Sequence, residues 1–261
     1  MSAASSAPSA ASAAAPAGAV PTARVLSLPF AGGSAAAYAG WAAALPSDIE
    51  VIAIELPGRG TRFREPALRS MTALADFAMA ACLGYLDRPL VLFGHSMGAV
   101  LALELARRLH AQGATPAALI VSGCRAPHLA SLRSAPLFAL PTEQLLHELA
   151  QMDGMPPALL AVPGLIDVFL PTIRADLQCR EQWRTAVQPL PIPIHVLAGH
   201  ADRLVPLGEL EAWASHSTQA LAVSVFEGGH FFIREHEREV LACVARAVRA
   251  SVPAMPSTLR T

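Results

Sequence analysis

The sequence predicts an α/β domain, built on a mostly parallel sheet with helices on both faces and with a helical lid inserted in its second half. Two observations support this prediction. Short apolar segments of strand length alternate with helical segments from residue 24 to about residue 124. The alternation stops over about residues 125–184 and then resumes. At 261 residues the chain can form one such domain, expected over residues 23–250, with room for the insertion.

Each predicted strand is an apolar run of the kind found inside parallel sheets. In chain order, the strands are Arg24 to Phe30, Ile49 to Leu56, the run that begins at Pro89, Ala117 to Cys124, Pro193 to Gly199 and Leu221 to Glu227. Helices are expected between them, because apolar residues recur there at helical spacing. The helices pass through Tyr38 and Trp41, cover Met71 to Leu86, Ala99 to Ala111 and Leu207 to Ser215, and end with one that buries Val240, Leu241, Val244 and Val248.

The insertion over residues 125–184 is rich in proline and leucine and shows no strand. One stretch, Thr142 to Met152, has helical spacing, with Leu145, Leu146 and Leu149 on one face. Active sites of open parallel sheets lie at the carboxyl edge of the strands, so an insertion there is expected to form a lid with an apolar inner face. The alternative is a peripheral helical decoration that only stabilises the domain.

The two ends of the chain are expected to lie outside the domain. Residues 1–22 are mostly Ala, Ser and Pro and lack the basic start and the leucine-rich centre of a secretion signal, which predicts a disordered tail. A second tail is expected over residues 251–261. The longer apolar runs elsewhere are interrupted by charged residues or prolines, which argues against a membrane span.

Charge and cysteine content limit the partners and the compartment. A net charge of −1 gives no long-range attraction to nucleic acid or to an anionic membrane, so docking to a charged partner must be local. The four cysteines lie far apart and fit neither a metal site nor a small disulfide framework. They are Cys82, Cys124, Cys179 and Cys243. A reduced, cytoplasmic protein is the simplest interpretation.

A nucleophile elbow is predicted at Gly94-His95-Ser96-Met97-Gly98, where a buried strand turns into a helix. The sharp turn forces the serine into a strained conformation and brings strand and helix together, so a side chain at either glycine would clash. The hydroxyl of Ser96 should project from the sheet edge. The amide of Met97, at the start of the helix, should point toward the group that the serine attacks. The pattern alone is weak, so the prediction depends on its surroundings.

A second amide for the same purpose is expected in the loop Ala31-Gly32-Gly33-Ser34, directly after the first strand. Small residues there allow backbone amides to face outward. Acyl-transfer hydrolases of this architecture take one oxyanion donor from such a loop. We therefore predict an oxyanion hole made by the amides of Ala31 and Met97. The alternative is an ordinary glycine turn into a helix.

Serine needs a base within hydrogen-bond reach and a carboxylate that orients the base. Asp202 and His230 each follow a predicted strand and complete the chain order Ser, acid, His of α/β-hydrolases. This predicts catalytic roles for Ser96, Asp202 and His230. The rivals are His200, which shares a loop with Asp202, His95, which is expected to point away from the nucleophile, and the lid carboxylates Asp167 and Asp176. The helical histidines His110, His147, His216 and His236 are expected to face solvent.

Three arginines, Arg59, Arg62 and Arg64, lie in the loop after the second strand. Such a cluster beside an active site could attract a phosphate or an acidic partner. Solvated charges that fix the turn are the favoured interpretation, because exposed ion pairs contribute little binding or stability.

Taken together, these segments resemble the type II thioesterases that accompany polyketide and nonribosomal peptide synthases. The matching segments of the core are LPFAGGSAAAY (28–38), ELPGRGTRFREP (55–66), FGHSMGA (93–99), ADRLVP (201–206) and EGGHFFI (227–233), and those of the lid are PLFALP (136–141), GMPP (154–157) and LPTIRADL (170–177). The resemblance spans Arg24 to Arg249. One departure is Gly60-Thr61, where the family usually has acidic residues.

The resemblance implies hydrolysis of acyl groups from the phosphopantetheine arm of acyl or peptidyl carrier proteins, with no metal or organic cofactor. In that case four lid residues are candidates for the acyl pocket: Leu145, Leu149, Leu160 and Phe169. A role in the core alone is equally compatible with buried leucine and phenylalanine. Two other functions stay open at this point, a carboxylesterase for small free esters and a binding module that has kept the elbow without activity.

Overall fold

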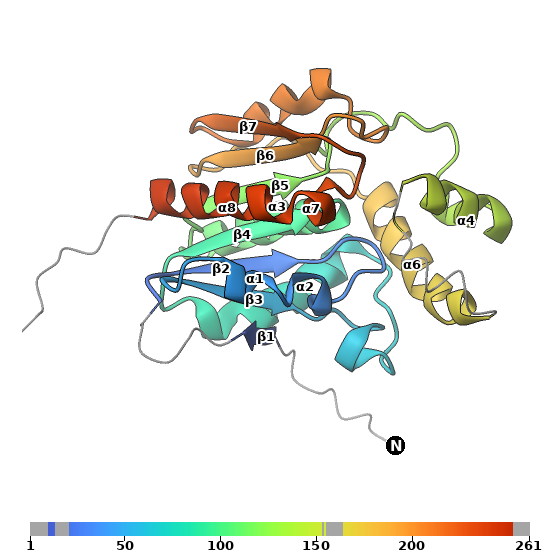
Figure 1. The fold of residues 1–261 in the computed structure, drawn as a ribbon, viewed down its shortest axis with the longest axis horizontal. Helices are drawn as coiled ribbons and strands as arrows, with labels where there is room; N and C mark the ends of the chain where they lie inside the picture. Colours follow the sequence, from blue (N-terminus) through green and yellow to red (C-terminus); the bar gives the residue numbers. More distant parts are fainter. Residues whose placement is uncertain (1–9, 14–20, 153, 155–163, 253–261) are drawn as a thin grey trace, which may run out of the picture.

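The computed structural model describes residues 10–13, 21–152, 154 and 164–252, and it centres on a seven-stranded sheet with the order β1-β3-β2-β4-β5-β6-β7 (Figure 1). All neighbouring strands are parallel except β1, which pairs antiparallel with β3. The strands are β1 (Ala10–Ala13), β2 (Ala23–Leu28), β3 (Ile49–Ile54), β4 (Leu90–His95), β5 (Ala118–Ser122), β6 (Ile194–Gly199) and β7 (Leu221–Phe226). The mostly parallel sheet confirms the predicted fold class.

Helices cover both faces of the sheet, because successive strand residues point to opposite sides. On β2, Leu26 contributes to one core cluster together with α2 (Met71–Cys82) and α3 (Met97–Ala111). The neighbouring Val25 belongs to the other cluster, which contains α1 (Trp41–Ala44) and α8 (Glu237–Ser251). The remaining helical pieces of the core are η1 (Ala35–Tyr38), η2 (Gly60–Arg62), η3 (Leu83–Tyr85), η5 (Leu207–His216) and α7 (Phe232–Glu235).

The insertion supplies η4 (Leu137–Ala139), α4 (Thr142–Gln151) and α6 (Leu165–Gln182), which lie beyond one edge of the sheet (Figure 1). Helix α4 matches the predicted stretch. Helix α6, with its 18 residues, was not apparent from the sequence, because Pro171 lies inside it and charged residues interrupt its apolar spacing. A proline removes one backbone hydrogen bond and usually ends a helix. Helix α6 continues past it and packs against the core, with Cys179 among the buried residues.

The N-terminal tail also differs from the prediction. Residues 10–13 form β1 and add an edge strand to β3, with Ala10 opposite Ile54 and Ala13 opposite Val51. Edge pairing uses backbone groups, so an Ala/Ser composition without β-branched residues gives no sign of it. Residues 1–9 and 14–20 lie outside the described part of the chain, as do residues 253–261 of the expected C-terminal tail. Within the described residues, every helix is too short or too polar to cross a bilayer.

Candidate active site

The corner between β4 and α3 has the geometry of a nucleophile elbow. Ser96 adopts φ 54° and ψ −114°, and it is the one non-glycine residue with positive φ among the described residues. A β-carbon on Gly94 would lie 2.0 Å from the carbonyl oxygen of Gly98. A β-carbon on Gly98 would lie 2.2 Å from the carbonyl oxygen of Leu28. Both glycines are therefore required by close backbone approach, and the strain predicted for the serine is present.

Three side chains from distant parts of the chain meet at this corner. The Nε2 atom of His230, in the loop after β7, lies 3.0 Å from the hydroxyl oxygen of Ser96. Its Nδ1 atom lies 2.8 Å from Oδ2 of Asp202, in the loop after β6. An ionised carboxylate only accepts, so Nδ1 donates to Asp202 and Nε2 is left to accept from Ser96. The second oxygen of Asp202 accepts from the amide of Leu204 at 2.8 Å, which fixes the carboxylate.

Burial favours this arrangement. His230 and Asp202 are each 6% exposed, whereas Ser96 is partly exposed and lines a cavity. Burial keeps most water away from the imidazole and the carboxylate, and this strengthens the hydrogen bond between them. Ser96 alone of the three is open to a substrate. The arrangement can therefore activate a hydroxyl toward a bound electrophile.

The two amides predicted for the oxyanion hole belong to the loop that follows β2 and to the first residue of α3, directly after Ser96. Ala31 follows β2, and the amide of Gly33 donates to the carbonyl of Phe30 at 2.8 Å, with Gly32 at φ 74°. This is the pattern of a type II turn, with Ala31 and Gly32 at its centre. In the described part of the chain, neither the amide of Ala31 nor that of Met97 donates a hydrogen bond to another residue. Both amides are therefore available to a ligand.

A cavity of about 810 Å³ opens at Ser96 and His230. Its walls come from residues 123–138, from the end of the insertion between residues 177 and 184, and from residues 203–205. The acyl-pocket residues predicted from the sequence do not line it. Leu145, Leu149 and Phe169 instead pack in a cluster of the insertion around Leu137 and Ile173, which is the core role weighed as the alternative. Leu160 lies outside the described residues.

The charge of the cavity wall is mainly positive. Five arginines and one glutamate line the cavity: Arg125, Arg133, Arg180, Arg184, Arg203 and Glu181. Arg125 pairs with Glu209, and Arg133 lies 3.0 Å from Glu148, so part of this charge is compensated by neighbours. The sequence did not indicate this clustering, because the arginines come from three separate segments.

The rival histidine His95 is fully buried and donates or accepts toward Ser122, with Nδ1 2.9 Å from the hydroxyl oxygen. Burial, followed by the charge of the nearby His230, holds the pKa of His95 well below its usual range. It is therefore a neutral ring packed against His230, with 5.1 Å between ring centroids, and does not contact Ser96 through a hydrogen bond. The prediction of a solvent-facing His216 is wrong: its ring is fully buried between Arg107 and His128.

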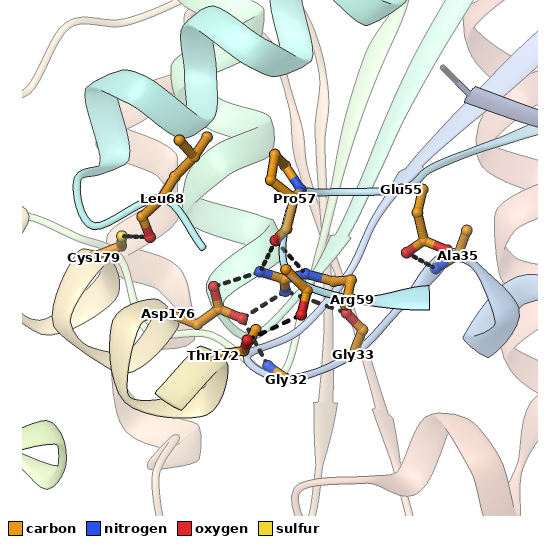
Figure 2. Close-up of polar contacts among 11 residues, drawn as sticks. Gly32, Gly33, Ala35, Glu55, Pro57, Arg59, Leu68, Thr172, Asp176 and Cys179 are labelled. Carbon is orange, nitrogen blue, oxygen red and sulfur yellow. Dashed lines mark hydrogen bonds and ion pairs between the residues drawn. The ribbon is translucent and has the colours of Figure 1, made fainter. Parts of the chain in front are cut away.

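The arginine loop also differs from the favoured interpretation. Arg59 is only 3% exposed and donates to both carboxylate oxygens of Asp176, at 2.6 Å from Nη1 and 2.8 Å from Nη2 (Figure 2). Arg62 is buried as well and pairs with Glu65 at 2.7 Å. These are buried structural charges, and only Arg64 of the three is exposed. Asp176 is thereby excluded as the partner of His230, since its oxygens are used elsewhere.

Comparisons with known proteins agree with this geometry. The family model for the thioesterase domain matches residues 23–250. The probable anguibactin biosynthesis thioesterase AngT of Vibrio anguillarum is 34% identical over 225 residues, covering 83% of this chain and 88% of AngT. RedJ, a thioesterase from the prodiginine pathway of Streptomyces coelicolor, superposes with a TM-score of 0.81 at 33% identity, covering 88% of this chain and 90% of RedJ.

A second solved structure extends the comparison. YbtT, the type II thioesterase of the yersiniabactin NRPS/PKS pathway, superposes with a TM-score of 0.81 at 32% identity. The superposition covers 91% of this chain and 97% of YbtT. The 23–250 range matched by the family model includes the elbow, the insertion and the loops that hold Asp202 and His230. This chain therefore belongs to the thioesterase family, as a serine hydrolase of the α/β-hydrolase fold that acts on thioesters.

Proposed function

We propose that this enzyme is a type II, editing thioesterase that removes acyl groups from the phosphopantetheine arm of carrier proteins in polyketide or nonribosomal peptide synthesis. The observation that supports it most is the position of His230, which lies within hydrogen-bond distance of both Ser96 and Asp202 and lines the same cavity as Ser96. Relatives named for anguibactin, prodiginine and yersiniabactin pathways support the biosynthetic setting.

The proposed reaction has two steps. In the first, the oxygen of Ser96 attacks the thioester carbonyl while His230 takes the hydroxyl proton, and the imidazolium so formed is stabilised by Asp202. The amides of Ala31 and Met97 stabilise the negative oxygen of the tetrahedral intermediate. The C–S bond then breaks, and His230 returns the proton to the leaving thiolate. In the second step water attacks the acyl-serine while His230 takes one of its protons. The C–O bond to Ser96 then breaks, His230 returns the proton to the serine oxygen, and a carboxylic acid is released.

The positive charge of the cavity wall is consistent with a negatively charged substrate. A phosphopantetheine arm carries a phosphodiester, and arginine is the side chain best suited to bind phosphate oxygens. Arg180, Arg184 and Arg203 line the cavity that opens at Ser96. Because the net charge of the whole chain is −1, an anionic partner can be attracted only by a local cluster of positive charge. The arginines of the cavity wall form such a cluster.

The proposal needs no metal or organic cofactor, because the chain supplies the nucleophile, the base and the oxyanion donors. It places the enzyme in the cytoplasm. Its four thiols are all free in the structure, which is typical of proteins from reducing compartments.

The test compares two substrates with the purified enzyme. Release of an acyl group from an acyl carrier protein is measured beside hydrolysis of the p-nitrophenyl ester of the same acid. We expect kcat/KM to be higher for the carrier protein, and we expect Arg203→Ala to lower it for the carrier protein more than for the ester. A strong preference for the ester would instead favour a carboxylesterase. Failure to cleave either, together with no labelling by a fluorophosphonate, would indicate a binding module.

A further inference from the structure

The buried carboxylate of Asp176 is shared between an arginine and a backbone amide next to the oxyanion hole. Asp176 lies on α6 and is fully buried. Its Oδ2 atom accepts from Arg59 at 2.6 Å and from the amide of Gly32 at 2.8 Å (Figure 2). The guanidinium of Arg59 also donates to the carbonyl of Gly33 at 3.3 Å. The glycine pair is thus held on one side through an N–H group and on the other through a carbonyl.

These contacts control the orientation of one particular peptide group. The amide of Gly32 belongs to the central peptide of the turn from Phe30 to Gly33, and rotation of that peptide converts a type II turn into a type I turn. The rotation would change ψ of Ala31 and φ of Gly32, directly beside the amide of Ala31 that is the proposed oxyanion donor. A hydrogen bond from Gly32 to a carboxylate is charge-assisted and therefore strong. Asp176 consequently holds Ala31 in one backbone conformation.

Helix α6 reaches the same loop through side-chain packing. A β-carbon on Gly32 would lie 2.7 Å from Cγ1 of Ile173, one turn before Asp176 on α6. Ala31 itself packs against the cluster that contains Ile173. On the same helix, Thr172 donates to the carbonyl of Gly58 at 3.0 Å, in the loop that carries Arg59 (Figure 2). Helix α6 therefore contacts both the loop that carries Ala31 and Gly32 and the loop that carries Arg59.

We propose that Asp176, held by Arg59, is a positioning residue for the oxyanion hole: it fixes the turn that presents the amide of Ala31, so that α6 of the insertion completes the active site instead of only covering it. This inference rests on the proposed roles of Ser96 and Ala31. It does not depend on a carrier protein as the substrate, because the tetrahedral intermediate of any ester or thioester cleaved by Ser96 carries the same negative oxygen.

Two neutral replacements of similar size separate positioning from stability. Asp176→Asn and Asp176→Leu both remove the charge that pairs with Arg59, but only Asn keeps an oxygen that can accept from Gly32. That oxygen should occupy the place where the donors of Arg59 and Gly32 meet. A third variant, Arg24→Met, serves as a control for stability: it removes the ion pairs of Arg24 with Glu50 and Asp87, at the end of β2 opposite to the site.

The readout is kcat per active site, with sites counted by the final extent of fluorophosphonate labelling, for an acyl-N-acetylcysteamine thioester and for a p-nitrophenyl ester. We expect Asp176→Leu to lower kcat about tenfold on both substrates, with KM within about twofold. This loss is smaller than the 10²- to 10³-fold that follows outright removal of one oxyanion donor. We expect Asp176→Asn to retain kcat within about threefold, and Arg24→Met to lower the melting temperature alone.

Two outcomes would overturn the positioning role. If Asp176→Leu and Asp176→Asn have the same kcat per labelled site, the pair serves stability alone. If Asp176→Leu yields too little folded protein to assay, a tenfold loss of kcat in Asp176→Asn without any change in its KM would equally contradict the inference, because the acceptor is still present. A wild-type enzyme that is not labelled at Ser96 would instead refute the proposed function.

Discussion

The carbonyl oxygen of Leu28 faces Gly98 so closely that a β-carbon there would lie only 2.2 Å away. The end of β2 and the first turn of α3 are therefore in direct backbone contact. This contact brings the end of β2, which leads into the loop of Ala31, close to the start of α3, where Met97 is the first residue. The glycine of the elbow thus has two consequences, a sharp turn at Ser96 and the assembly of the site around it.

We expect Gly98→Ala to cost at least about 1–3 kcal/mol in the free energy of unfolding, because the methyl group meets backbone that cannot move aside. Activity should fall with it, since the end of β2 and the start of α3 are forced apart. Gly84→Ala is the matched control, with open space around its β-carbon. Urea denaturation and kcat of both variants check this, and a Gly98→Ala enzyme as stable and active as Gly84→Ala would be inconsistent with the close contact.

Asp202→Asn is expected to lower kcat by about 10³- to 10⁴-fold while leaving the fold intact. The side-chain amide of Asn can donate to His230 and so favour the wrong tautomer of the imidazole. Steady-state kinetics on a thioester, with circular dichroism of the same sample, measures this. Asp167→Asn, at an exposed position of α6, should have wild-type kinetics. A loss of less than tenfold in Asp202→Asn would mean that another group orients His230.

Two leucines of the insertion should behave in opposite ways. Leu145 is fully buried in the cluster of the insertion, so Leu145→Ala should cost about 2–5 kcal/mol of stability and leave the ratio of kcat/KM for long and short acyl chains unchanged. Leu132 is 55% exposed and lines the cavity. Leu132→Ala should lower that ratio about fourfold or more, the equivalent of about 0.8 kcal/mol for one methylene contact. A change of this ratio in Leu145→Ala but not in Leu132→Ala would instead support the acyl pocket predicted from the sequence.

The stability of the enzyme should decrease as the pH falls from about 6.5 to 4. Burial, followed by the charges of Arg107 and His128, lowers the pKa of His216 from 6.5 to about 4. In this range the unfolded chain binds a proton at His216 and the folded chain does not, so acid favours unfolding by up to about 3 kcal/mol, and the loss stops below pH 4. His216→Gln should have a shallower pH dependence in urea titrations, whereas the exposed His110→Gln should match the wild type. Equal slopes for all three proteins would contradict the assignment.

The sequence contains most of the fold, because six of the seven strands are long apolar runs and their order specifies a parallel sheet. The two missed elements each lack that signal. The strand β1 consists of Ala and Ser and pairs with β3 through its backbone, and α6 contains Pro171 and an irregular apolar pattern. The positions of Ser96, Asp202 and His230 relative to the strands were also predictable, because the carboxyl ends of parallel strands share one edge.

The surroundings of the site were harder to predict from the sequence. Arg59 and Asp176 are 117 residues apart, and local composition cannot show that one charge neutralises the other in the core. Isolated charges in a loop are usually solvated. The prediction of solvent-exposed side chains is therefore wrong for Arg59 and Arg62, which are buried. The same applies to the cavity, whose wall includes many loop residues between 123 and 136, a stretch without a periodic pattern. Tertiary contacts decide these features.

The central claim is that His230 activates Ser96 toward a thioester. The most direct test mixes the enzyme with an acyl carrier protein, stops the reaction in acid within milliseconds to seconds, and measures the intact mass and the modified peptide. We expect the mass of the acyl group on the peptide that contains Ser96, and neither adduct nor turnover in Ser96→Ala. Retained hydrolysis by Ser96→Ala, or an acyl group bound to a different residue, would contradict the account.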